Sequence, residues 1–207
     1  ALLRDTVPRF GLGPGMRIDL ALKVPVAGEE ISLRNGPLRL ATLKAVPSSE
    51  EIAASWPAAL PANPVSEPDL KRAETLRFNF EWAGALSTNV DQGGAYSFWQ
   101  INGQAWDIND KTCADRPIAT LKKDGHYIFE LRNLSQYQHP IHLHGMTFKV
   151  ISSNRRQIEP WFTDTYLLGK NETARIALVA DNPGVWMFHC HVIDHMETGL
   201  MAAIEVV

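Results

Sequence analysis

The sequence lacks several features that mark common classes of protein. No apolar run approaches the roughly 20 residues that a membrane-spanning helix needs. No run of lysine or arginine occurs, and the formal net charge is −3. These absences argue against a membrane span and against a nucleic acid or an anionic membrane as a partner. No signal peptide opens the chain, but this says little if the natural start lies elsewhere.

Histidine and cysteine are scarce, and they gather in two short stretches. The chain of 207 residues has seven histidines and two cysteines, and residues 1–74 contain no histidine. Six of the histidines and one cysteine lie in His139–Gly145 and in Trp186–Met201. These two stretches are therefore where the chemistry of the protein is expected.

The later stretch begins as a buried strand. Residues 185–188 are apolar and follow the turn signal Asn182-Pro183-Gly184. If the strand continues, its side chains alternate between two faces. His189 and His191 then point to one side and Cys190 to the other, so one strand can serve two sites.

The earlier stretch, His139-Pro140-Ile141-His142-Leu143-His144-Gly145, repeats this pattern. His142 and His144 share a face, and His139 has the opposite parity. Pro140 places His139 at the entry to the strand, where a missing N–H is tolerated. Each stretch can therefore supply two imidazoles to one site and at least one ligand to another.

The ligand types point to copper. A thiolate with two imidazoles is the donor set of a blue copper site, and Cys190, His139 and His195 can supply it. The histidines without a thiolate suit copper, zinc or iron. A structural zinc site needs only four ligands in a closed set. Seven candidate ligands are too many for that alternative.

The two stretches, with His195 and Gly199, resemble the C-terminal signature pair of the multicopper oxidases, which include the laccases. The copper nitrite reductases fit less well, because their cysteine lacks the second flanking histidine. The resemblance implies an all-β, cupredoxin-like Greek-key sandwich in a periplasmic or secreted enzyme. It also implies four coppers per complete enzyme, with a type 1 copper that takes electrons from a substrate and a type 2/type 3 trinuclear cluster that reduces O2 to water.

The resemblance also assigns roles to single residues. It implies three groups of copper ligands: His139, Cys190 and His195 for type 1, His142 for type 2, and His144, His189 and His191 for type 3. Cys190 with its neighbours His189 and His191 would carry electrons between the sites, so these three are the expected catalytic residues. The family's axial position lies ten residues after the cysteine, at Leu200, which cannot coordinate. A three-coordinate copper favours Cu(I) and a raised potential. Met201 as the axial ligand is the alternative, which strand alternation disfavours.

The chain divides into three parts. Residues 1–46 alternate like short strands, and Pro14–Leu20 resembles the late part of the second cupredoxin domain of three-domain oxidases. About 45 residues are too few to close a sandwich, so we predict an incomplete domain; a small independent hairpin is the alternative. Residues 47–74 are rich in Pro and Ser and predict a linker with a short helix around residues 50–55.

Residues 75–207 predict the C-terminal cupredoxin domain. Runs typical of strands are separated by turn signals, and no segment has a convincing helical period. The expected strands lie at residues 76–80, 96–101, 118–121, 127–131, 146–151, 173–178, 185–188 and 201–207.

Several other residues have two interpretations. His126 is expected to be a surface histidine, and Cys113 either pairs with a cysteine outside this chain or is free. The methionines are expected to pack in the core or line the copper pocket, rather than form a cuprous-ion site. Glu159, Asp164 and Glu197 are either contacts to a substrate or a ligand histidine, or solvated loop charges.

The chain offers only half of the ligands that the family's trinuclear cluster uses. That cluster takes eight histidines, and four are present here. The others are expected as two His-x-His pairs from N-terminal domains, in the same gene product or another chain. A two-domain laccase would need those pairs in the same product. We therefore predict the C-terminal piece of a roughly three-domain enzyme.

The predicted function is a laccase-like oxidase. It would couple one-electron oxidation of phenolic, amine or similar small donors to the four-electron reduction of O2. Two alternatives stay open: a metallo-oxidase that acts on Cu(I), Mn(II) or Fe(II), and a blue-copper electron-transfer module that does not reduce O2.

Overall fold

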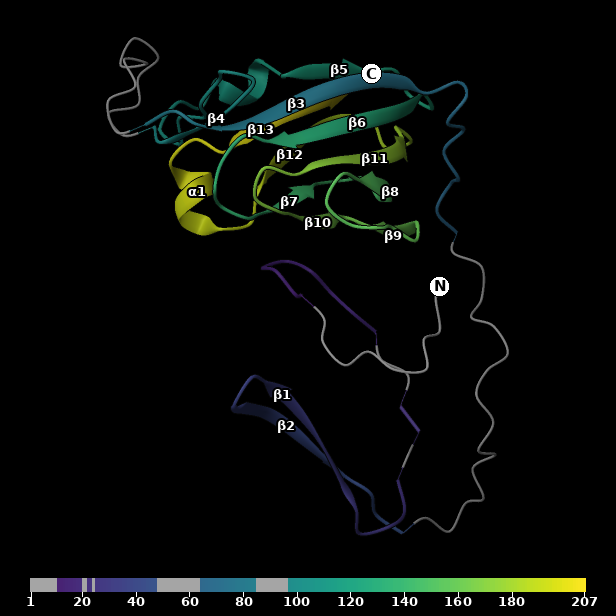
Figure 1. Cartoon of the computed structure of the whole chain (residues 1–207). Coiled ribbons are helices and arrows are strands. Elements are labelled where there is room, and N and C mark those ends of the chain that lie inside the picture. Colours follow the sequence, from purple (N-terminus) through teal and green to yellow (C-terminus); the bar gives the residue numbers. More distant parts are fainter. Residues whose placement is uncertain (1–10, 20–21, 24, 48–63, 85–96) are drawn as a thin grey trace. The chain divides into compact units, whose positions relative to one another are not determined.

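The computed structural model describes residues 11–19, 22–23, 25–47, 64–84 and 97–207 (Figure 1). Its contacts divide the chain into two compact units. Described residues 11–17 and 64–207 fall in the larger unit, and residues 18–47 fall in the smaller one. No helix in the described part of the chain is long and apolar enough to cross a membrane.

The smaller unit contains one β-hairpin. β1 (Glu30–Asn35) pairs antiparallel with β2 (Leu38–Lys44), and Gly36 supplies the positive φ of the turn. Leu33, Leu40 and Leu43 are exposed on these strands. An isolated two-stranded hairpin is at best marginally stable in water, which disfavours a small independent hairpin. That residues 1–46 belong to an incomplete domain stays a prediction. The predicted helix near residues 50–55 lies outside the described residues.

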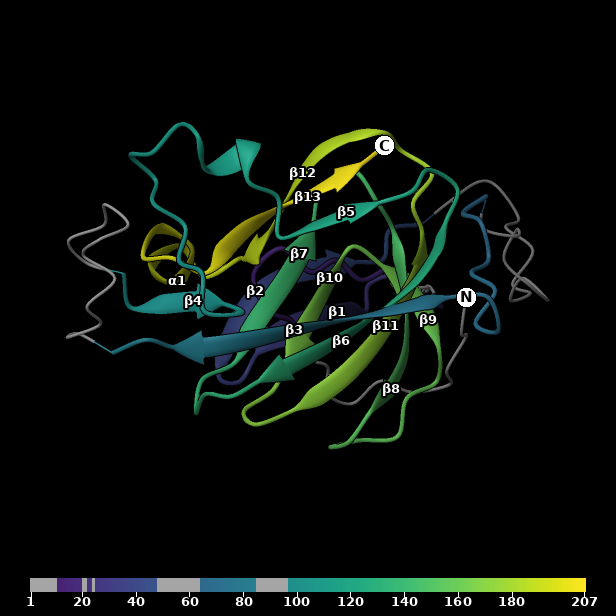
Figure 2. The same ribbon diagram turned by 90° about the horizontal axis from the view of Figure 1, so that it is seen from above.

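The larger unit is a sandwich of two sheets (Figures 1 and 2), as expected for an all-β cupredoxin-like chain. The five-stranded sheet has the order β10 (Thr165–Leu168), β7 (His139–Leu143), β12 (Gly184–Cys190), β13 (Met201–Val206), β5 (Ala119–Leu121). The six-stranded sheet has the order β4 (Trp99–Ile101), β3 (Glu74–Trp82), β6 (His126–Asn133), β11 (Thr173–Val179), β8 (Phe148–Ser153), β9 (Trp161–Thr163).

Aromatic rings fill the space between the sheets. Phe78 of β3 and Phe129 of β6 lie with ring centroids 4.8 Å apart, and Phe188 of β12 approaches them from the other sheet at 5.2 and 6.1 Å. All three side chains are almost completely buried. Each buried ring contributes about 1.5–3 kcal/mol to folding, and Phe188 adjoins His189, so the core supports the end of the strand that carries the candidate ligands.

Residues 75–207 contain two short helical elements, although no segment there has a convincing helical period. A five-residue helix, α1 (Ile193–Glu197), follows β12, and a 3₁₀ turn, η2 (Cys113–Asp115), follows β4. Figure 1 shows α1 at one end of the sandwich. A helix of five residues spans little more than one turn, so it leaves no readable hydrophobic period. It places His195 back over the end of β12.

Candidate functional site

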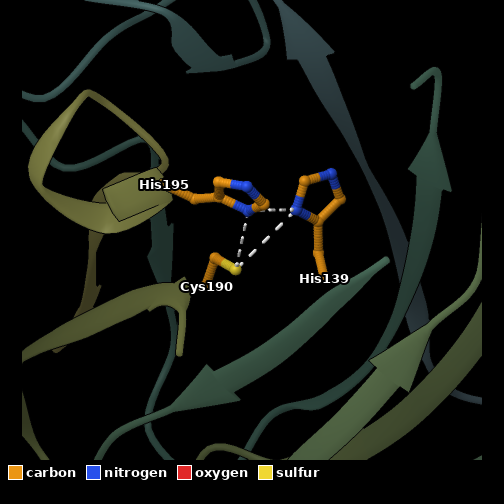
Figure 3. A group of neighbouring side chains, drawn as sticks. All are labelled: His139, Cys190 and His195. Carbon is orange, nitrogen blue, oxygen red and sulfur yellow. Dashed lines mark hydrogen bonds between the residues drawn. The ribbon is translucent and has the colours of Figure 1, made fainter. Parts of the chain in front are cut away.

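The end of β12 separates two groups of donor atoms, as the alternation of its residues predicted. We call His139, Cys190 and His195 the cysteine cluster (Figure 3). The Sγ atom of Cys190 lies 3.7 Å from Nδ1 of His139 and 3.7 Å from Nδ1 of His195. The two Nδ1 atoms are 3.1 Å apart. Three elements, β7, β12 and α1, therefore bring one donor atom each to a single point.

These distances fit one small metal ion. Bonds of about 2.0–2.1 Å to nitrogen and 2.3 Å to sulfur, spread in a plane at about 120°, would separate the donor atoms by about 3.6–3.8 Å. The two sulfur–nitrogen distances match this range, and the nitrogen–nitrogen distance is somewhat shorter. A thiolate with two imidazoles is also the donor set of blue copper sites. The residues present therefore fit copper.

Burial controls the protonation of this cluster. It lowers the pKa of His139 to about 3, assisted by repulsion from His195, and it lowers the pKa of His195, which Asp194 partly offsets. Both imidazoles are therefore neutral at pH 7 and can bind a metal. Burial raises the pKa of Cys190 to about 12, although the N–H of Val192 donates to its sulfur at 3.4 Å. A bound cation is needed to make this thiol a thiolate.

A hydrogen-bonded chain fixes the tautomer of His139. The hydroxyl of Ser135 donates its proton to Oδ1 of Asn133 at 2.8 Å. Its oxygen lies 2.9 Å from Nε2 of His139, so it must accept the Nε2 proton. Nδ1 therefore keeps its lone pair, directed into the cysteine cluster. Asn133 is itself held, because it donates to the carbonyls of Tyr137 and Gly169.

The register between β12 and β13 bears on whether Leu200 or Met201 occupies the axial position. His189 pairs with Met201 between β12 and β13, and paired residues share a face of the sheet. Extending this register pairs Cys190 with Leu200, whose carbonyl accepts from the N–H of Cys190 at 3.1 Å. Leu200 is fully buried in the same apolar core as Cys190. The register thus favours Leu200 over Met201 for the axial position, which stays a prediction.

Aromatic rings surround the imidazoles of the cysteine cluster. The ring of Trp99 lies 4.5 Å from that of His195 and 4.8 Å from that of His139. Tyr137 contacts His195 at 6.0 Å, and Trp82 stacks on Tyr137 at 6.3 Å. Tyr137 and Trp82 are about half exposed, at 55% and 49%. A stack of rings thus leads from the surface to His195.

The second group, which we call the histidine cluster, comprises His142, His144, His189 and His191. One ring nitrogen of each of His142, His189 and His191 lies within 4.8 Å of the other two. His144 joins through His189, because their Nε2 atoms are 3.0 Å apart. The register aligns His142 of β7 with His189 of β12. Strand parity indicated the grouping of six of the predicted ligands, and the structure groups them in that way. The seventh, His195, comes from α1. The assignment of the ligands to particular coppers stays a prediction.

Backbone carbonyls fix two tautomers in the histidine cluster. Nδ1 of His189 donates to the carbonyl of Cys190 at 2.9 Å, and Nδ1 of His142 donates to the carbonyl of Asp164 at 2.8 Å. Each Nε2 therefore carries a lone pair. Burial lowers the pKa of His189 to about 4 and also lowers those of His144 and His191. His144, His189 and His191 are thus neutral nitrogen donors, and imidazole nitrogen fits copper.

The remaining candidates lie elsewhere, except for Asp164. Nδ1 of His126 accepts from the N–H of Asp69 at 3.0 Å, and His126 joins neither cluster. Cys113 is buried and free. Glu197 is exposed. Asp164 lies beside His142, with Oδ1 3.9 Å from Nδ1, so its interpretation as a contact to a ligand histidine is favoured.

Several neighbours of the ligands have no recognisable signal in the sequence. Ser135 bonds to His139, Asn133 bonds to Ser135, and Trp99 packs on two ligand rings. Ser135 lies four residues before His139, a separation with no fixed meaning outside a helix. Only the tertiary contacts identify these residues.

Comparison with known proteins agrees with this chemistry. Residues 79–207 match the family model described as multicopper oxidase. The bilirubin oxidase of Albifimbria verrucaria is 38% identical over 117 residues, which cover 52% of this chain and 20% of that protein.

Two solved structures are much more similar. The multicopper oxidase from Pseudomonas thermotolerans is 72% identical with a TM-score of 0.76, and the match covers 88% of this chain and 41% of that one. The multicopper oxidase from Pseudomonas parafulva is 70% identical with a TM-score of 0.78, and it covers 94% and 45%. The chain thus spans less than half the length of these relatives.

Proposed function

The chain belongs to the multicopper oxidase family, and we propose that it is the C-terminal part of a laccase-like oxidase. The complete protein would couple one-electron oxidation of small donors to the four-electron reduction of O2 to water. In this proposal residues 1–46 end a preceding cupredoxin domain, residues 47–74 link the domains, and residues 75–207 carry the ligands. The resemblance to the family favours a periplasmic or secreted enzyme.

The observation that carries the proposal is that Cys190 belongs to one cluster and adjoins two members of the other. His189 and His191 are its direct neighbours in the chain, and Nδ1 of His189 donates to the carbonyl of Cys190 at 2.9 Å. Covalent bonds and one hydrogen bond therefore connect the two clusters. An electron carrier needs only the cysteine cluster, so four additional convergent histidines argue for a reaction beyond electron transfer.

Each cluster has a distinct part in the proposal. Copper at the cysteine cluster supplies a one-electron acceptor, and a type 2/type 3 cluster, completed by two His-x-His pairs from outside this chain, supplies the electrons that O2 needs. His139, Cys190 and His195 would hold the type 1 copper. His142 would bind the type 2 copper, and His144, His189 and His191 the type 3 pair. The residues around the cysteine cluster exclude water, and Ser135 orients His139.

The surroundings of His195 favour aromatic donors. Tyr137 and Trp82 present half-exposed rings that lead to this histidine. Planar phenols and aromatic amines stack on such rings. A metallo-oxidase acting on Cu(I), Mn(II) or Fe(II) needs thioether or carboxylate ligands at its entry site, and among the described residues the cysteine cluster is the only group of three or more His, Cys, Asp or Glu donors that includes His195.

The test is to count the coppers in the complete protein that contains this chain and to record its optical and EPR spectra. We expect four coppers with both type 1 and type 2 signals, and O2 uptake with a phenolic donor. A single copper with only a type 1 signal would reduce this chain to an electron-transfer module. O2 uptake with Fe(II), Mn(II) or Cu(I) but not with phenols would favour the metallo-oxidase.

A further inference from the structure

The segment Gly11–Arg17 lies against the side of the larger unit that carries the histidine cluster. It forms a turn in which the N–H of Met16 donates to the carbonyl of Gly13 at 3.1 Å. A Cβ atom added to Gly13 would lie 3.1 Å from Cδ1 of Leu167 and 3.3 Å from Cβ of Pro140. The turn is thus packed closely on β7, the strand that carries His142, and on its neighbour β10.

Gly15 lies against the ring of a candidate ligand. A Cβ atom added to Gly15 would lie 2.4–2.8 Å from three atoms of the His191 ring, which is closer than real side chains approach. Gly15 also has φ +76, a conformation that side chains other than glycine disfavour. Both observations require glycine here, and its backbone limits how far the imidazole of His191 can move.

Arg17 connects this turn to the other side of the cluster. Its guanidinium donates to the carbonyl of Gly15 at 3.1 Å and forms an ion pair with Oδ2 of Asp164. Oδ1 of Asp164 accepts the hydroxyl proton of Thr165 at 3.0 Å. The hydroxyl oxygen, 3.0 Å from Nδ1 of His142, is therefore left to accept the Nδ1 proton, which the carbonyl of Asp164 shares at 2.8 Å.

We propose that Gly15 and Arg17 are positioning residues for the histidine cluster. Gly15 limits the movement of the His191 ring. Arg17 acts through Asp164 and Thr165 to hold the Nδ1 proton of His142, so that its Nε2 lone pair faces the metal. The inference rests on the proposed function, because it concerns the copper that His142 would bind. It adds residues from the N-terminal segment to a site whose ligands in this chain all lie after residue 138.

A role in stability alone predicts a different result. The Arg17 side chain is 70% exposed, and exposed ion pairs contribute little to folding. Interactions that orient a ligand histidine, in contrast, typically change metal affinity 10- to 100-fold. Loss of Arg17 should therefore change copper binding at one cluster and leave thermal unfolding almost unchanged.

The experiment compares variants of the complete, copper-loaded protein during titration with a copper chelator. The type 2 EPR signal reports the copper that His142 would bind, and the blue absorption reports copper at the cysteine cluster. For Arg17→Gln we expect loss of the type 2 signal at about tenfold lower chelator concentration, with unchanged blue absorption and Tm. Arg17→Lys keeps a positive charge near Asp164 but lacks the planar guanidinium. Its type 2 signal should therefore be lost at a chelator concentration between those of Arg17→Gln and the wild type.

Arg77→Gln is the matched control, because Arg77 also forms an exposed ion pair, with Glu130 of the six-stranded sheet. It should titrate like the wild type. If Arg17→Gln also titrates like the wild type, or if it loses blue absorption in parallel with the type 2 signal, the positioning role is wrong. A wild-type protein with a single copper would overturn the proposed function and this inference together, so the two failures are distinguishable.

Discussion

The two clusters meet at two successive residues of β12, His189 and Cys190, yet they differ in burial and completeness. In the cysteine cluster His139 and Cys190 are completely buried, and the three donors fit one metal ion. In the histidine cluster only His189 is buried, while His142, His144 and His191 are partly exposed. The cysteine cluster has all three of its donors in this chain. The histidine cluster is partly exposed, so that further ligands could approach it.

This difference in burial changes what each cluster requires of a metal. Burial opposes the thiolate of Cys190, whose pKa rises to about 12, so the cysteine cluster gains its charge only with a bound cation. His144, His189 and His191 of the histidine cluster need no such deprotonation, because burial lowers their pKa values and favours the neutral imidazole. One strand can therefore hold a largely buried site beside a partly exposed one.

The largest effect is expected from Cys190→Ser, which removes the soft ligand of the cysteine cluster and the link between the clusters. The complete protein should lose its blue absorption and all oxidase activity, measured by O2 uptake. Cys113→Ser is the control, since Cys113 is also a buried free cysteine and lies in neither cluster. Retained blue absorption in Cys190→Ser would contradict the assignment of the thiolate.

His191→Ala tests the two clusters independently. It removes one donor of the histidine cluster and leaves all three donors of the cysteine cluster, so the blue absorption should persist while O2 reduction stops. The absorption should bleach with a reductant and fail to return in air. His126→Ala, which affects a histidine outside both clusters, should keep full activity. Normal O2 uptake in His191→Ala would show that the predicted connection is wrong.

Acid should destabilise the copper-free protein through both clusters. His139 and His189 titrate near pH 3 and 4 when folded, against 6.5 for their ordinary value. Below pH 6.5 the unfolded state therefore binds protons first, and stability falls as the pH falls towards 4. Each group should lower the free energy of unfolding by about 1.4 kcal/mol per pH unit.

Urea unfolding of the copper-free protein at pH 6 and pH 4 measures this slope. His139→Gln removes one of the two groups and should reduce the slope by about 1.4 kcal/mol per pH unit. An unchanged slope in this variant would mean that His139 is not kept neutral by burial.

The smallest effect concerns the axial position of the cysteine cluster. Leu200→Met would offer a thioether, which stabilises Cu(II) and lowers the reduction potential. A shift of about 60 mV corresponds to a tenfold change in a one-electron equilibrium, and redox titration of the blue absorption detects it. Met201→Leu is the control and should leave the potential unchanged. A shift in Met201→Leu instead would place the axial position at Met201.

Most strands of the sandwich were predictable, because alternation of apolar residues reports directly on which side chains face the core. β3, β6, β11 and β12 cover the segments that their patterns indicated, and β13 covers all but the last residue of its segment. The helix α1 was not predictable, since five residues are too few to show the 3.6-residue period of a helix. The division of six donors between two groups was also predictable, because residues two apart share a face of a strand, whereas His195 lies on α1.

The sequence by itself determined the donor types, their parity and therefore the existence of two clusters joined at Cys190. These properties are local, fixed by residue identity and by the two-residue period of a strand. Only the tertiary structure decided which cluster is more buried, which tautomers Ser135 and Asp164 impose, and that Gly15 and Arg17 lie beside the histidines. Arg17 and Asp164, for example, are 147 positions apart in the chain, and no local pattern encodes a distance in space between them.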